Sequence, residues 1–114
     1  MPNDAARDPS DESRPRRVVV AGVARAETGG GDAGLEELLV RRARTLRDTG
    51  VEVIWAGTGL HPDQVAAIGV SEDADGVEVA PTEATDGVVR ALARMEADDV
   101  EVVAAAGAGD LTHG

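Results

Sequence analysis

The sequence predicts an α/β protein in which helices cover both faces of a parallel β-sheet. Short β-branched segments alternate with helical segments, at the spacing that right-handed βαβ units produce. Residues 17–23 (RVVVAGV) show no polar alternation, as expected for a strand that is buried on both faces. Trp55 is the only aromatic residue, so the core must be built from Val, Leu, Ile and Ala. A chain of 114 residues is long enough for one domain but not for two.

Seven elements are expected in turn. The first helix has its apolar residues on one stripe and its arginines largely off that stripe, and Gly50 follows it where a left-handed cap is expected. Pro62 opens the second helix, at a position where an N–H group is not needed. The third helix is expected to carry Val88, Val89, Leu92 and Met95 on one face. The predicted order is strand 17–23, helix 35–48, strand 51–55, helix 62–72, strand 76–80, helix 85–97 and strand 100–106.

Charge and composition exclude several classes of function. The net charge is −11, from 22 acidic and 11 basic residues, and an acidic excess argues against binding nucleic acid or an anionic membrane through a basic surface. Every basic residue is Arg, and from Asp48 onward only two arginines face 14 acids. A high-GC genome and a salt-rich cytoplasm explain this composition more simply than a function does. Residues 1–15 are polar and Pro-rich, so they are predicted to be a disordered tail before a domain at 16–110.

Catalytic and metal sites are not expected. The chain has no cysteine, which excludes disulfides, thiolate metal sites and cysteine nucleophiles. His61 is expected to cap the second helix, and His113 lies near the end of the chain, so the two histidines make a poor zinc site. No side chains pair a nucleophile with a base. No apolar segment has the length of a signal peptide core or a membrane span, and the expected location is cytoplasmic.

The candidate ligand site lies in the loops that follow the strands. In open parallel sheets, ligands bind at the carboxyl ends of the strands where the strand order reverses. Residues 29–34 match G-x-G-x-x-G, but about six residues separate them from the first strand, and no acid ends the second strand to hold a ribose, which disfavours a dinucleotide. Glu27 is the one carboxylate placed to meet a ligand. The loops concerned are 24–34, 57–61, 80–84 and 107–110.

The middle of the chain carries a family resemblance. Residues 46–57 (LRDTGVEVIWAG) are similar to the segment L-R-D-x-G-x-E-V-I-x-x-G, and residues 60–67 (LHPDQVAA) and 72–77 (EDADGV) to x-x-P-E-Q-V and E-D-x-D-x-V. On these motifs the chain resembles the cobalamin-binding domain of methylmalonyl-CoA mutase and its separately encoded small subunits, over about residues 16–109. The resemblance implies a flavodoxin-like (Rossmann-like) three-layer α/β/α fold with a sheet of order 2-1-3-4-5, of which this chain is expected to form about four strands in the order 2-1-3-4. The family continues into a fifth strand and a last helix, which this chain is expected to lack.

The resemblance also implies a cofactor site with an altered first loop. The family anchors cobalt through the histidine of D-x-H-x-x-G, whose Asp orients that histidine. Aligning residues 32–34 with the last three positions of this motif puts Gly31 in place of the histidine and Gly29 in place of its Asp. Thr82 is the nearest hydroxyl where the family has small hydroxyl residues after the third strand. The implied cofactor-binding residues are Gly29, Gly30, Gly31, Asp32, Gly34, Thr58, Gly59 and Thr82.

The expected function is that of an accessory or small subunit related to methylmalonyl-CoA mutase. It would do no chemistry alone, because the radical rearrangement belongs to cobalamin and to a separate substrate-binding subunit. The alternative is a cofactor-free interaction module that kept the fold and lost cobalamin. A third class is an enzyme acting on a small phosphorylated or nucleotide ligand at the same loops. The expected partner is a mutase large subunit or a second copy, paired through the edge of the fourth strand.

Overall fold

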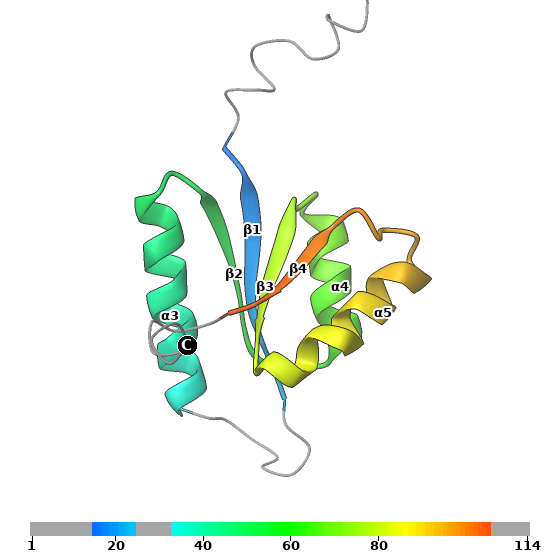
Figure 1. Cartoon of the computed structure of the whole chain (residues 1–114), viewed down its shortest axis with the longest axis horizontal. Helices are drawn as coiled ribbons and strands as arrows, with labels where there is room; N and C mark the ends of the chain where they lie inside the picture. Colours follow the sequence, from blue (N-terminus) through cyan, green and yellow to red (C-terminus); the bar gives the residue numbers. More distant parts are fainter. Residues whose placement is uncertain (1–14, 25–32, 106–114) are drawn as a thin grey trace, which may run out of the picture.

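The computed structural model describes residues 15–24 and 33–105, and of the predicted tail it describes only Pro15. Four parallel strands form one sheet in the order β2-β1-β3-β4, as predicted (Figure 1). The strands are β1 (Arg17–Val23), β2 (Glu52–Leu60), β3 (Gly76–Ala80) and β4 (Glu101–Ala104). The helices are α3 (Ala33–Asp48), α4 (Pro62–Ser71) and α5 (Thr85–Arg94), and a short 3-10 turn, η1 (Thr82–Ala84), precedes α5.

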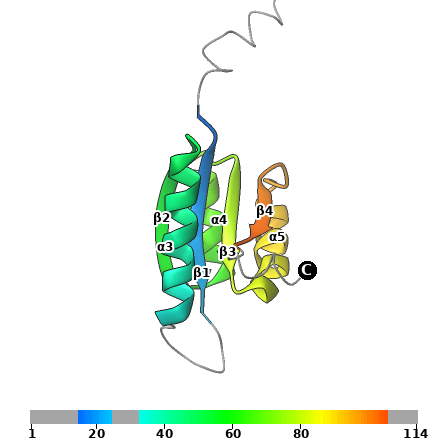
Figure 2. The ribbon, with the colours of Figure 1, turned by 60° about the vertical axis from the view of Figure 1, so that its left-hand side comes forward.

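The molecule has three layers, with α3 on one face of the sheet and α4 and α5 on the other (Figures 1 and 2). Each face buries its own aliphatic cluster. Val19, Val77 and Val79 point towards α4 and α5, whereas Val18 and Val20 point towards α3 and pack around Leu39. Trp55 is 39% exposed, so the core is aliphatic as predicted. The alternation of side chains along β1 and β3 divides the two clusters.

β2 extends five residues beyond its predicted end at Trp55. It continues through Gly57 and Gly59, which have φ angles of 102° and 73°. Its pairing with β1 shifts register twice, between Val20 and Ala21 and again between Ala21 and Val23. Glycines in a strand can mark bulges as well as turns, and here the ladder continues past them, with the Ala24 N–H donating to the Leu60 carbonyl at 2.9 Å. The prediction of a loop at 57–61 was therefore wrong for residues 57–60, which belong to β2.

The ends of the helices follow the predicted caps closely. α3 begins two residues earlier than expected and ends at the predicted Asp48, where Gly50 has a φ of 92° and donates its N–H to the Arg47 carbonyl. α5 ends three residues earlier than expected, at Arg94. Its buried residues include Val88 and Leu92, as predicted, but Val89 and Met95 are exposed. Val89 lies about 60° beyond Leu92, outside the buried stripe, and Met95 follows the last residue of α5 as its C-cap.

Among the helices of the described ranges, none has the length and apolar character needed to cross a membrane.

Candidate functional site

The carboxyl edge of the sheet is where the fold places a ligand site. β1 lies between β2 and β3, and the chain passes from β1 to α3 on one face but from β3 to α5 on the other. The connections after β1 and β3 therefore diverge, and in parallel α/β sheets this reversal of direction opens a crevice beyond the strand ends.

The predicted site residues that the structure describes all belong to this edge. Thr58 and Gly59 are among the last three residues of β2. Thr82 is the first residue of η1, shortly after β3, and Gly34 lies in the first turn of α3. Four further predicted residues fall outside the described residues, together with Glu27, residues 107–110 and His113. Those four are Gly29, Gly30, Gly31 and Asp32.

The four described residues differ in how accessible they are. Gly59, Thr82 and Gly34 are exposed, and Thr82 uses its backbone carbonyl to accept a hydrogen bond from the Thr85 hydroxyl at 3.1 Å. Thr58 is half-buried. A Cβ placed on Gly22 would lie 3.0 Å from the Thr58 Cγ2, which shows that the Thr58 methyl packs closely against β1 below α3. The exposed groups of the site are thus the backbone at Gly34 and Gly59 and the side chain of Thr82.

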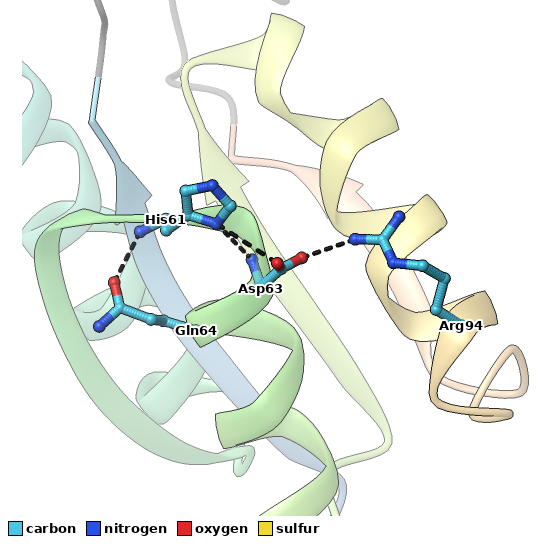
Figure 3. Close-up of polar contacts among 4 residues, drawn as sticks. All are labelled: His61, Asp63, Gln64 and Arg94. Atoms are coloured by element: carbon cyan, nitrogen blue, oxygen red, sulfur yellow. Dashed lines mark hydrogen bonds and ion pairs between the residues drawn. The ribbon is translucent and has the colours of Figure 1, made fainter.

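His61 follows the end of β2 and forms the N-cap of α4, as predicted (Figure 3). Its Nδ1 accepts a hydrogen bond from the Asp63 N–H at 3.1 Å, and its own N–H donates to the Gln64 side chain at 2.9 Å. The Asp63 carboxylate in turn accepts a hydrogen bond from Arg94 Nη2 of α5, at 2.7 Å from its Oδ1. This bond joins the capped end of α4 to α5. This is a reciprocal capping arrangement with histidine in the place of the usual Ser or Thr.

The cap also determines which nitrogen of His61 carries the proton. A neutral imidazole has one donor and one acceptor nitrogen, so an accepting Nδ1 leaves the proton on Nε2. Metal coordination through Nε2 would require the other tautomer and would break the bond to Asp63. The ring is 68% exposed, yet its hydrogen bonding opposes a role as a cobalt ligand.

A buried ion pair, Glu78 with Arg42, was missed by the sequence analysis. Glu78 lies in the middle of β3, is only 7% exposed and points towards α3. Arg42 donates from Nε at 2.7 Å and from Nη2 at 3.0 Å to the two carboxylate oxygens. The hydrogen bond to Glu78 raises the pKa of the Arg42 guanidinium, assisted by the Glu78 charge and opposed by partial burial. The available signal was an acid inside a strand whose other residues are apolar and buried.

A hollow lies away from the carboxyl edge, on the α3 face of the sheet. It has a volume of about 180 Å³ and opens between the C-terminal half of α3 and β4, where no described helix covers the strands. An ion pair between Arg16 and Glu101 borders it. Its apolar lining includes Val18, Leu46, Val51 and Val103.

No group of three or more His, Cys, Asp or Glu side chains within residues 15–24 and 33–105 could hold a metal ion. Comparison of the chain with protein-family models and with curated proteins gives no match.

Proposed function

We propose that this chain is a small accessory subunit of the cobalamin-binding type, which holds a corrinoid without a protein ligand to cobalt. The observation that carries the proposal is the exposure of Gly59 and Thr82 at the carboxyl ends of β2 and β3, beside the point where the strand order reverses. The similarity of residues 46–57 to the mutase cobalamin-binding domain supports the choice of ligand.

The donor groups suit a corrinoid that keeps its own lower ligand. In the proposal, backbone N–H groups of the glycines 29–31 and 34, the backbone at 58–59 and the Thr82 hydroxyl hold the cofactor. Asp32, which follows glycines 29–31 in the sequence, is also assigned to the cofactor site in the proposal. His61 is committed to the cap of α4 and supplies no lone pair to cobalt. Cobalamin provides the radical chemistry when it is bound, and a separate large subunit provides the substrate site, so the chain itself has no catalytic residue. In this proposal the protein is located in the cytoplasm.

Titration with hydroxocobalamin and adenosylcobalamin, followed by visible absorbance in low salt and in molar KCl, tests the proposal. We expect saturable binding with the spectrum of a cofactor that retains its lower ligand. Replacing Thr82 by Val should weaken binding about three- to tenfold, since one hydrogen bond is lost. Thr45→Val is the matched control, because Thr45 is an exposed threonine of α3 on a different part of the surface.

Two results would contradict the corrinoid proposal. One is the absence of binding in either salt. The other is a spectrum of histidine-ligated cobalt that disappears in His61→Asn, a variant that can still cap α4.

A cofactor-free interaction module is the second candidate function, and the open edge of β4 favours it. In the described part of the chain, β4 is bonded on one side only, to β3. Exposed strand edges are places where another chain can add a strand. The candidate partners are a mutase large subunit and a second copy of this chain. If corrinoid binding fails but a change at β4 abolishes association with a partner, this second function stands in place of the first.

A further inference from the structure

The backbone of β4 presents hydrogen-bonding groups at the edge of the sheet with which no strand in the described part of the chain pairs. Glu101 donates its N–H to the Asp75 carbonyl at 3.2 Å, and Ala105 donates to the Val79 carbonyl at 2.7 Å. Alternate residues of a strand direct these groups to the same side, so Val103 also faces β3. Val102 and Ala104 therefore turn their N–H and C=O groups outwards, where no described strand pairs with them.

The two edges of the sheet are protected differently. β2, at the opposite edge, contains two register shifts and two glycines with positive φ, features that twist an edge away from regular pairing. β4 pairs with β3 in regular register and contains no Pro and no bulge. Of the two edge strands, β4 thus has the more regular backbone for pairing with another strand.

Apolar side chains continue from β4 on both faces of its edge. Val103 lies on the α3 face and is 37% exposed. On the other face, Gly87 and Arg94 mark the side of α5 that faces α4, because they contact Pro62 and Asp63. Val89 is 49% exposed and lies about 200° around the helix from Gly87, so it faces away from α4, on the flank beside β4. A strand added to this edge would cover Val103, and a helix packed on the α5 side of that strand would lie beside Val89.

Charge favours this edge as the contact between two copies of an acidic chain. Each copy carries a net charge of −11, so two copies repel each other over most of their surfaces. The only ionisable side chain of β4 is Glu101, and Arg16 neutralises it. The residues of β4 thus carry no unpaired charge, and a second copy brings the same strand. The exposed carboxylates of Asp98 and Asp99 lie before the strand, outside the segment that would pair.

We propose that two copies pair antiparallel through β4, about a two-fold axis that passes beside Val103. In this register Val102 of each copy exchanges N–H···O=C bonds with Ala104 of the other, and the two Val103 side chains face each other on the α3 face. Each Glu101 lies opposite Ala105 of the second copy, so the two carboxylates stay apart. The inference rests on the interaction-module function and is independent of corrinoid binding.

A single cysteine tests both the dimer and its register, because the chain has no cysteine of its own. The two Val103 residues form a non-hydrogen-bonded pair with Cα atoms about 4.5 Å apart, within the range that a disulfide spans. Val103→Cys should therefore form a covalent dimer on mild oxidation. Ala104→Cys is the matched control. In the proposed register residue 104 of one copy lies opposite residue 102 of the other, so the Cα atoms of the two residues 104 are more than about 7 Å apart and the cysteines should not cross-link.

Analytical ultracentrifugation of two further variants separates this dimer from other associations. Ala104→Pro removes an N–H that β3 does not use, so the monomer should fold while dimerisation weakens at least about tenfold. Val70→Glu changes an exposed valine of α4, away from β4, and should leave the dimer intact.

Three outcomes are decisive. A dimer that cross-links through residue 103 and dissociates in Ala104→Pro supports the inference. A monomeric native chain overturns it, as does a dimer that Ala104→Pro leaves unchanged. If the native chain is monomeric but binds a mutase large subunit, and Ala104→Pro abolishes that binding, the interaction module survives with a different partner. If Ala104→Pro leaves that binding unchanged too, the module itself fails.

Discussion

Glu78 shows how one residue can connect two layers of this fold. Its carboxylate is buried in the middle of β3, and Arg42 reaches it from α3 with two nearly parallel hydrogen bonds. A bidentate guanidinium–carboxylate pair satisfies both carboxylate oxygens and fixes the rotation of the helix over the sheet. The pair replaces apolar packing that the same space could hold, so its contribution is to geometry more than to net stability.

Removing only one partner of this pair should be more harmful than removing both. Arg42→Met leaves a buried carboxylate without its partner and should lower the free energy of unfolding by about 2–3 kcal/mol. The double variant Arg42→Met, Glu78→Met should recover most of that loss, because no buried charge remains. Urea denaturation of the native chain, Arg42→Met, Glu78→Met and the double variant measures the coupling. Equal losses in the single and double variants would contradict this account.

At the scale of elements, α4 depends on its N-terminal cap for both its start and its position. His61 accepts the Asp63 N–H, Gln64 bonds back to His61, and Asp63 contacts Arg94 of α5 (Figure 3). The Asp63–Arg94 pair is exposed, so it contributes little by itself. The cap is thus the stronger of these local interactions, and it keeps the end of β2 and the start of α4 in a defined orientation beside the candidate site.

Replacing His61 by Ala should lower the free energy of unfolding by about 1 kcal/mol, the typical loss when a side-chain cap is removed. His61→Asn should keep most of that stability, since Asn is among the best N-cap residues. Thermal or urea unfolding followed by circular dichroism gives both values. If the two variants are equally destabilised, the ring acts through packing and not through its hydrogen bond.

At the scale of the whole molecule, charge is distributed unevenly along the chain. The exposed side of α3 carries Arg41, Arg44 and Arg47, whereas the acids are concentrated in the chain after Asp48. A net charge of −11 destabilises the compact state through self-repulsion. Salt weakens that repulsion, since the Debye length falls from about 10 Å at 0.1 M to about 3 Å at 1 M.

The urea midpoint of unfolding should therefore rise with KCl concentration. The double variant Asp98→Asn, Asp99→Asn removes two exposed carboxylates beside β4 and should be more stable in low salt, with a weaker salt dependence. Arg44→Gln makes the net charge more negative and should have the opposite effect. Each change should be about 0.5 kcal/mol or less. A midpoint that is the same at all salt concentrations would show that self-repulsion is not significant in this fold.

Much of the candidate site could be placed from the sequence because parallel strands end at a common edge. Once the strands were assigned, Thr58 and Gly59 had to lie at the carboxyl end of β2, and Thr82 had to follow the carboxyl end of β3. Their different accessibility could not be predicted. Thr58 is half-buried because Gly22 lets its methyl approach β1, and this contact joins residues that are far apart in the chain.

The sequence by itself determined the features that depend on neighbouring residues. Periodicity assigned the strands and helices, the near absence of aromatic residues required an aliphatic core, and His61 with Pro62 marked the start of α4. The tertiary structure alone decided how far β2 extends, which residue balances Glu78, and that β4 pairs with β3 in regular register. The physical reason is one of range: propensities and caps act within a few residues, whereas register, buried charge pairs and sheet edges depend on contacts between distant segments.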